Sequence, residues 1–358
     1  MSKVLVVDDS ALMRRLLTGV LSEAGHQVQT AHNGAEGVQR LLDWQPDVVT
    51  LDINMPEMDG LTSLSLMMQA RPTPVVMVSS LTEKGAQATF EALALGALDF
   101  ITKPGGTISL SLEDIRGQLL EKVQAAARSR LRPARTPAPS PRPAVAARPR
   151  AVAPPPAAAA PATGMPEGLV MVGVSTGGPR TLEDILPALP EDFPWPVLVA
   201  QHMPQNFTGA FARRMDSLCR LRVRECTGTM PIERGTVYIG RGGTDMVVCE
   251  RLGRLAVQPR PENPAHPWHP SVDVMVDSAM KLMPAERLIG VQLTGMGDDG
   301  ARAMTRLKRQ GGRTVAESED TAVVFGMPAE LIAQGGASLV LPSPDIGRQL
   351  LLWARPRA

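Results

Sequence analysis

The sequence predicts an α/β protein with two doubly wound parallel-sheet domains joined by a long linker. Short apolar runs alternate with helical patterns over residues 1–125 and again over 167–350, which is typical of a parallel sheet covered by helices on both faces. Residues 126–166 contain no acidic side chain and are rich in proline, alanine and arginine, which predicts a disordered linker. The length of 358 residues also suits two domains.

Charge, cysteine content and hydropathy exclude several classes of protein. The net charge of +1 provides no overall field for nucleic acid or a membrane surface. Cys219, Cys226 and Cys249 are scattered and form no C-x-x-C motif or disulfide framework, which fits a reducing cytosol. The N-terminal apolar run is too short for a signal peptide, and no run of about 18 apolar residues occurs. We therefore expect a cytoplasmic protein without a membrane span.

The first segment is expected to hold five strands and five helices. The expected strands lie at residues 4–7, 28–31, 48–51, 75–78 and 100–102. The expected helices lie at residues 11–23, 35–43, 61–70, 87–95 and 112–127. This alternation fits the flavodoxin-like strand order, in which the ligand site lies at the carboxyl ends of the strands.

Polar side chains stand where the expected strands of the first segment end. Asp8 and Asp9 end the first strand, Asp52 the third, Ser79 the fourth and Lys103 the fifth. Because the carboxyl ends of parallel strands meet at one edge of the sheet, these side chains should converge. Clustered carboxylates repel one another unless a cation joins them, and such oxygen ligands suit Mg²⁺. Each aspartate alone also suits a helix cap, but the set predicts a site where an aspartate can be phosphorylated.

The second segment predicts another doubly wound parallel sheet. The expected strands lie at residues 169–174, 197–200, 222–226, 236–239, 246–249, 255–258, 288–293 and 313–316. The expected helices lie at residues 180–186, 207–215 and 301–310. We expect the strands between about residues 222 and 258 to form an antiparallel excursion from the parallel sheet.

A glycine-rich turn follows the first strand of this second segment. Gly173, Ser175 and Gly177 satisfy the G-x-S-x-G pattern, which places a nucleophilic serine on a sharp turn between strand and helix. The glycines allow the turn and a close approach of substrate. The same turn is also compatible with phosphate binding or with a simple connection between strand and helix.

Two further groups suited to nucleophilic catalysis follow apolar strands. His202 comes after one strand, and Asp298 and Asp299 come shortly after another. A serine, a histidine and a carboxylate are the members of a catalytic triad, although their order here differs from the Ser, Asp, His order of α/β-hydrolases. A structural histidine and helix-capping or metal-binding aspartates remain alternatives, and spacing does not choose between the two aspartates. The His-Pro-Trp-His-Pro stretch at 266–270 is expected to shape a loop rather than to bind a metal.

The motifs VVDDS, LDINMPEMDG, VMVSS and DFITKP make the first segment resemble the response-regulator receiver family. The resemblance implies that Asp52 is the phosphoacceptor, that Lys103 contacts the phosphoryl group, that Ser79 is the switch hydroxyl and that Phe100 moves with it. The residues that it assigns to Mg²⁺ binding are Asp8, Asp9 and Asp52.

The motifs GVSTGGP, QHMP, HPSVD, LTGMGDDG and VVFGMP make the second segment resemble the catalytic domain of the chemotaxis protein-glutamate methylesterases, a Rossmann-like domain. The resemblance implies that Ser175 is the nucleophile, His202 the general base and Asp299 the orienting carboxylate. We place the oxyanion hole at backbone amides near Thr176 and Met296.

Together the two resemblances imply a phosphorylation-activated hydrolase that acts on glutamate methyl esters, and on glutamines, of chemoreceptor helices. A histidine kinase would supply the phosphoryl group, and the receiver would cover the active site at rest. We expect a monomer that needs Mg²⁺ for phosphorylation, no cofactor for ester hydrolysis and no nucleic acid. A DNA-binding regulator would need a basic recognition helix, which the second segment lacks. A degenerate esterase acting as a phosphorylation-dependent scaffold remains open.

Overall fold

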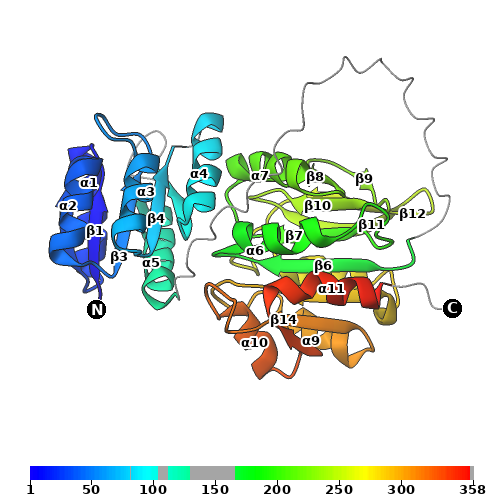
Figure 1. Cartoon of the computed structure of the whole chain (residues 1–358). Coiled ribbons are helices and arrows are strands. Elements are labelled where there is room, and N and C mark those ends of the chain that lie inside the picture. Colours follow the sequence, from blue (N-terminus) through cyan, green and yellow to red (C-terminus); the bar gives the residue numbers. More distant parts are fainter. Residues whose placement is uncertain (81, 104–111, 130–165, 355–358) are drawn as a thin grey trace, which may run out of the picture.

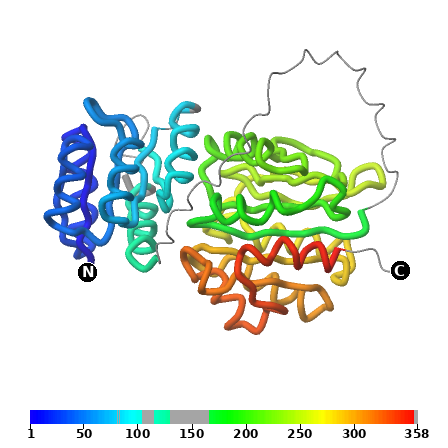
Figure 2. The backbone as a smooth tube through the Cα atoms, in the orientation of Figure 1, coloured from blue at the N-terminus to red at the C-terminus, as the bar shows by residue number. Residues whose placement is uncertain are grey.

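The computed structural model describes residues 1–80, 82–103, 112–129 and 166–354, which form two α/β domains lying side by side (Figure 1). The backbone trace in Figure 2 runs from blue to cyan in the N-terminal domain and from green to red in the C-terminal domain. These two parallel-sheet domains confirm the predicted fold class. Most of the predicted linker, residues 126–166, lies outside the described residues, so its disorder and the domain boundaries stay predictions.

A five-stranded parallel sheet in the order β2-β1-β3-β4-β5 forms the centre of the N-terminal domain. This is the expected flavodoxin-like order. Its central strands are fully buried and mostly apolar, because helices cover both faces of the sheet. The strands are β1 (Lys3–Val7), β2 (Gln27–Ala31), β3 (Val48–Asp52), β4 (Val75–Ser79) and β5 (Asp99–Thr102).

The first four helices of the N-terminal domain begin where a side chain caps them. The Thr82 hydroxyl accepts a hydrogen bond from the backbone N–H of Gly85, so α4 begins four residues before the expected residue 87. The other four helices begin and end within one residue of their expected bounds. The helices are α1 (Ala11–Glu23), α2 (Gly34–Trp44), α3 (Gly60–Ala70), α4 (Glu83–Leu95) and α5 (Leu112–Arg128).

A seven-stranded parallel sheet in the order β15-β14-β13-β6-β7-β10-β8 forms the centre of the C-terminal domain. The chain order switches on either side of β6, and open α/β sheets bind ligands at such a point, outside the carboxyl ends of the strands. The strands are β6 (Leu169–Val174), β7 (Val197–Gln201), β8 (Arg222–Cys226), β10 (Thr236–Gly240), β13 (Leu288–Gln292), β14 (Arg313–Glu317) and β15 (Leu339–Leu341).

The antiparallel sheet is smaller than predicted. The prediction was wrong for the strands at residues 222–226 and 236–239, which belong to the parallel sheet. β8 and β10 pair in parallel and extend the main sheet beyond β7. Every residue of β10 is buried, as in a strand covered on both faces, and this feature distinguishes it from an antiparallel hairpin strand. The antiparallel sheet contains only β9 (Met230–Pro231), β11 (Asp245–Arg251) and β12 (Arg254–Arg260).

Three helices (α8, α10 and α11) and two strands of the C-terminal domain were missed in the sequence. Pro328 and Pro344 lie near the first position of α10 and α11, where proline is tolerated because the first N–H groups of a helix need no partner within it. The missed strands are the short β9 and β15. The helices are α6 (Gly178–Ile185), α7 (Gln205–Leu218), α8 (Val272–Met280), α9 (Ala301–Arg309), α10 (Met327–Ala333) and α11 (Ser343–Trp353).

Buried aromatic rings join the two domains. Phe90 on α4 stacks with Phe211 on α7, with ring centroids 5.6 Å apart. Phe100 on β5 packs against Phe207 on α7 at 4.4 Å. All four rings are buried, so the α4–β5 side of the N-terminal domain is held against α7 by apolar burial. No helix in the described part of the chain combines the length and apolar character needed to cross a membrane.

Candidate functional sites

The polar residues at the strand ends of the N-terminal domain converge as expected. Asp8, Asp9 and Asp52 each place a carboxylate oxygen within 4.8 Å of the other two. Lys103 Nζ lies 2.7 Å from Asp52 Oδ2 and 3.2 Å from Asp8 Oδ2. Asp8 and Asp52 are buried and Asp9 is exposed, so the cluster opens to solvent on one side.

This cluster holds more negative charge than the neighbouring lysine compensates. Burial raises the pKa of Asp52 to about 6, against the hydrogen bond that Lys103 donates. Burial also raises the pKa of Asp8. For Lys103, burial acts to lower the pKa, but the neighbouring carboxylates of Asp52 and Asp8 together outweigh it and the pKa rises. Asp8 Oδ2 is buried without a well-aligned hydrogen bond from any described residue. These carboxylates therefore fit a Mg²⁺ ion, which prefers carboxylate oxygens.

The predicted switch residues Ser79 and Phe100 contact α4 and the C-terminal domain, respectively. The Ser79 hydroxyl lies 3.2 Å from the carbonyl of Gly85 and accepts a hydrogen bond of 2.8 Å from the Thr89 hydroxyl. These contacts direct the Ser79 hydroxyl toward α4. The Phe100 ring packs on Phe207 of the other domain. Both residues thus connect the acidic site to the domain interface.

Ser175 stands on a tight turn between β6 and α6. Its backbone N–H donates to the carbonyl of Thr294, and its carbonyl accepts from the N–H of Gly178, each at 2.9 Å. Gly177 has a φ of +79°, which glycine adopts without strain, and a Cβ there would lie 2.6 Å from Val323. A Cβ at Gly295 would lie 2.7 Å from the Cβ of Ser175. The serine is therefore held between two close-packed glycines.

His202 and Asp299 form a buried pair at the same edge of the sheet. His202 Nε2 lies 2.9 Å from Asp299 Oδ2, and both side chains are nearly inaccessible to solvent. Asp299 also accepts hydrogen bonds from the Ser271 hydroxyl at 2.9 Å and from the backbone N–H groups of Val272 and Asp273. Burial acts to raise the pKa of Asp299, but the bonded His202 and these N–H donors outweigh it and lower that pKa. Asp299 thus stays ionised.

The structure distinguishes the two candidate aspartates. Asp298 is exposed, whereas Asp299 contacts His202. His266, Asp273 and Asp299 also lie close enough together for a metal site. However, both oxygens of Asp299 already accept hydrogen bonds, which is the arrangement of an orienting carboxylate.

Several groups around the serine still lack a partner. His202 Nδ1 is buried without a hydrogen bond from any described residue, so it is the nitrogen left to accept a proton. No hydrogen bond joins Ser175 to His202 in the described part of the chain, and such bonds often form only once substrate binds. Within the same part, the N–H groups of Thr176 and Met296 donate no hydrogen bond. They stay our candidates for the oxyanion hole.

Two residues near the pair were missed in the sequence. Gln201 donates a hydrogen bond of 2.9 Å to the carbonyl of Ser175 and so ties the serine turn to the end of β7. Trp268 stacks on the His202 ring, with centroids 5.7 Å apart. The position of Gln201 directly before His202 was an available signal. For Trp268 the only signal was an indole inside the histidine- and proline-rich stretch.

The N-terminal domain lies beside the serine turn. Val323, which a Cβ at Gly177 would touch, packs against an apolar cluster of the N-terminal domain that includes Leu119 and Val123 of α5. Glu121 on α5 is partly buried, which raises its pKa, and it lies close enough to His202 for the two side chains to interact electrostatically. Ser175 itself is 8% exposed beside this interface.

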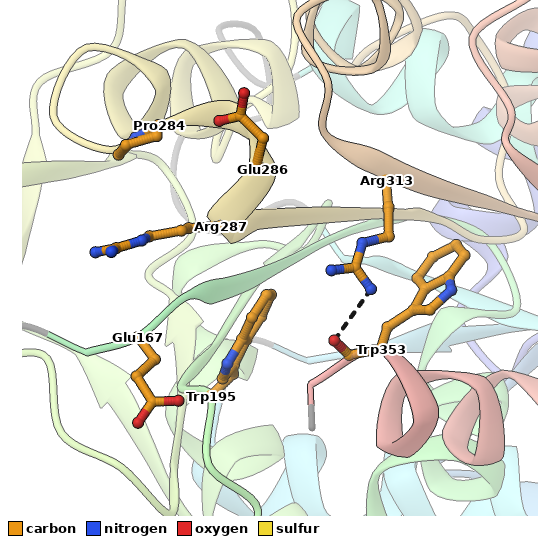
Figure 3. Close-up of a pocket in the computed structure, with 7 residues that line it drawn as sticks. All are labelled: Glu167, Trp195, Pro284, Glu286, Arg287, Arg313 and Trp353. Atoms are coloured by element: carbon orange, nitrogen blue, oxygen red, sulfur yellow. Dashed lines mark hydrogen bonds between the residues drawn. The ribbon is translucent and has the colours of Figure 1, made fainter. Parts of the chain in front are cut away.

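A separate hollow of about 560 Å³ lies at the opposite ends of the strands (Figure 3). Its lining residues precede or begin β6, β7, β13 and β14, or end α11. Within it Arg313 donates a hydrogen bond of 3.1 Å to the carbonyl of Trp353. None of the candidate catalytic residues lines it. The lining residues are Glu167, Trp195, Pro284, Glu286, Arg287, Arg313 and Trp353.

The fold and the two sites define a class of protein, a receiver-type domain joined to a parallel-sheet α/β domain that carries a serine beside a histidine–aspartate pair. Family models support both halves. Residues 4–112 match the response regulator receiver domain, and residues 170–350 match the CheB methylesterase family. The chain therefore belongs to the CheB methylesterase family and carries a receiver domain.

Individual relatives agree with this assignment over the whole chain. A protein-glutamate methylesterase/protein-glutamine glutaminase of Rhodospirillum rubrum is 54% identical over 99% of this chain and 96% of its own. One of Rhodopseudomonas palustris is 51% identical over the full length of both chains. Among solved structures, the CheB methylesterase catalytic domain of Thermotoga maritima is 38% identical, with a TM-score of 0.50, and covers 52% of this chain and 97% of its own.

Proposed function

We propose that this chain is a phosphorylation-activated hydrolase that demethylates glutamate methyl esters on chemoreceptors and deamidates receptor glutamines. The observation that carries the proposal is the buried His202–Asp299 pair beside the Ser175 turn. Family membership and the names of the relatives support the substrate class. The proposed setting is the cytoplasm, with the chain acting as a monomer.

The proposed chemistry uses Ser175 as the nucleophile. Its Oγ attacks the ester carbonyl while His202 Nδ1 takes the hydroxyl proton, and Asp299 holds the opposite nitrogen of the ring. The carbonyl oxygen becomes an oxyanion close to the N–H groups of Thr176 and Met296. The carbon–methoxy bond then breaks, and His202 returns the proton so that methanol leaves. Water attacks the acyl-serine by the same route and frees the glutamate carboxylate.

The same groups are suited to the deamidation of glutamine. An amide carbonyl passes through a similar oxyanion, and His202 protonates the leaving nitrogen so that ammonia departs. Both reactions yield a glutamate carboxylate, so both lower the number of neutral side chains on the receptor helix.

The proposed control lies in the N-terminal domain. A histidine kinase transfers a phosphoryl group to Asp52, and Lys103 then contacts the phosphoryl oxygens. Ser79 turns toward the new charge and gives up its contact with Thr89, which loosens the packing of Phe100 on Phe207. The interface shifts and Ser175 becomes accessible. When bound, Mg²⁺ would be held by Asp8, Asp9 and Asp52 and would neutralise phosphoryl charge.

Methanol release from methylated receptor membranes tests both halves of the proposal. We expect release by the full-length chain to rise when a small phosphodonor and Mg²⁺ are added. Asp52→Asn should keep the unstimulated rate and lose the stimulation. Ser175→Ala should abolish release under both conditions.

The other outcomes are equally informative. Release that ignores the phosphodonor would retain the esterase and reject the control by Asp52. A folded protein that releases no methanol from any methylated receptor would reject the enzyme and leave the scaffold function. Release by Ser175→Ala would reject the proposed nucleophile.

A further inference from the structure

The indole of Trp268 lies flat against the imidazole of His202. The two rings are parallel to within 1°, with centroids 5.7 Å apart, an offset stack in the range where aromatic pairs attract one another. Gly297 packs closely against the indole, since a Cβ at Gly297 would lie 2.7 Å from the six-membered ring of Trp268. Gly297 also has a φ of +90°, so both space and backbone favour glycine.

The loop that carries Trp268 is tied down by one buried carboxylate. Asp245, at the start of β11, is 1% exposed. Its Oδ1 accepts from the backbone N–H of Ser271 at 2.9 Å and contacts His269 Nδ1 at 3.0 Å, and its Oδ2 accepts from the N–H of Asn263 at 3.2 Å. Asp245 therefore binds both ends of the loop from Asn263 to Ser271, with Trp268 between them.

The same loop leads directly into the residues that hold Asp299. Ser271 caps α8, and its hydroxyl donates to Asp299, as do the N–H groups of Val272 and Asp273. One continuous segment thus fixes His202 in two ways. Its end orients the carboxylate at the edge of the imidazole, and its middle places an indole on the face of the ring.

We propose that Trp268 is a positioning residue for His202 and that Asp245 anchors it. An imidazole bonded at one nitrogen only can still rotate about its side-chain bonds. The indole restricts that rotation and keeps Nδ1 directed at the position of the serine hydroxyl. Small misplacements of a catalytic group reduce the rate strongly, by up to about 100-fold. This proposal rests on the proposed role of His202 as the general base.

The test measures methanol release against receptor concentration with the full-length, phosphodonor-activated chain. Trp268→Ala should lower kcat about 10- to 100-fold and change KM less than about two-fold, because the indole acts on the base and not on substrate binding. Trp268→Phe keeps a ring on the imidazole and should restore most of kcat. Trp44→Ala removes another half-buried indole, far away on α2, and should leave kcat unchanged.

The anchor is tested by a double-mutant cycle. Asp245→Ala should lower kcat in the same direction as Trp268→Ala, and the double variant should be little worse than either single variant, because both changes release the same loop. Independent, multiplying losses would overturn the anchoring role. Thermal melts identify any variant that fails to fold, and Trp268→Phe still tests the stack in that case.

Three results would overturn the role of Trp268. These are an unchanged kcat in Trp268→Ala, a rise in KM alone, which would make the indole a substrate contact, and a Phe variant as slow as the Ala variant. A failure of the proposed function itself would show in a different variant. If Ser175→Ala still releases methanol, the proposed catalytic trio is wrong, whatever Trp268 does.

Discussion

The buried carboxylates of the two sites differ in their hydrogen bonding and in the direction of their pKa shift. In the N-terminal domain, burial raises the pKa of Asp52 to about 6, and a buried oxygen of Asp8 lacks a well-aligned donor among the described residues. In the C-terminal domain, Asp299 accepts hydrogen bonds at both oxygens and has a lowered pKa. The first site is incomplete without a ligand, whereas the second is already organised.

This difference in charge compensation suits one site to switching and the other to catalysis. A site with uncompensated charge changes strongly when a cation or a phosphoryl group arrives, which suits a sensor. A site whose carboxylate oxygens all accept hydrogen bonds is preorganised and needs only access to its substrate. We call such a site saturated with hydrogen bonds. The packing of α4 and β5 against α7 lies between the two sites, and the control that we propose would act through it.

The largest expected effect comes from removing the charge of the saturated site. Asp299→Asn should lower kcat for methanol release about 10³- to 10⁴-fold, since an amide cannot stabilise the imidazolium or hold the same tautomer. Asp298→Asn changes the exposed neighbour in the same way and should stay near the wild-type rate. Equal losses in the two variants, measured with saturating phosphodonor, would contradict the assignment of Asp299.

A smaller effect is expected at the interface between the sites. Phe90 is 4% exposed and stacks with Phe211 across the domains. Phe90→Ala should raise the rate without phosphodonor about five-fold or more, because the closed arrangement loses apolar contact that the open one does not have. The phosphorylated rate should change little. Methanol release with and without phosphodonor gives both rates.

Leu42→Ala is the control for this prediction. Leu42 is 43% exposed on α2, on the side of the N-terminal domain away from the interface (Figure 1). Its removal should leave both rates unchanged. If Phe90→Ala leaves the unphosphorylated rate at the wild-type level, the covering arrangement does not limit access to Ser175.

Local patterns in the sequence were sufficient for the fold class and for the convergence of polar groups. Parallel strands bring their carboxyl ends to one edge, so apolar runs followed by Asp8, Asp52 or His202 already imply where these residues meet. The choice between Asp298 and Asp299 was different. Spacing alone left the choice open, because the side chains of adjacent residues differ mainly in the direction in which they point. The structure distinguishes the two aspartates by their burial.

Contacts between distant segments could not be predicted in this way. The stack of Trp268 on His202 joins a loop to a strand end that is far away in sequence, and nothing in the loop indicates its partner. The parallel pairing of β10 was also missed, because a short buried strand has no periodicity that distinguishes parallel from antiparallel neighbours.

The smallest expected effect is a dependence of stability on pH and Mg²⁺. The pKa of Asp52 rises from 3.8 to about 6 on folding, so the native state binds more protons than the unfolded state between these values. The free energy of unfolding without metal should therefore fall as the pH rises through this window. Asp8, whose pKa is also raised, acts in the same direction. The raised pKa of Lys103 acts only at alkaline pH.

Mg²⁺ competes with these protons for the same oxygens, so the two ligands should be linked. We expect Mg²⁺ to raise the melting temperature of the N-terminal domain by about 3 °C at about pH 7.5 and by much less at about pH 5. Scanning calorimetry measures the shift, and EDTA should reverse it. Asp52→Asn removes both the titrating group and a ligand, so the shift should shrink at the higher pH. An equal Mg²⁺ shift at both pH values would show that Asp52 is neither protonated nor a ligand there, and the contrast between an incomplete and a saturated site would fail.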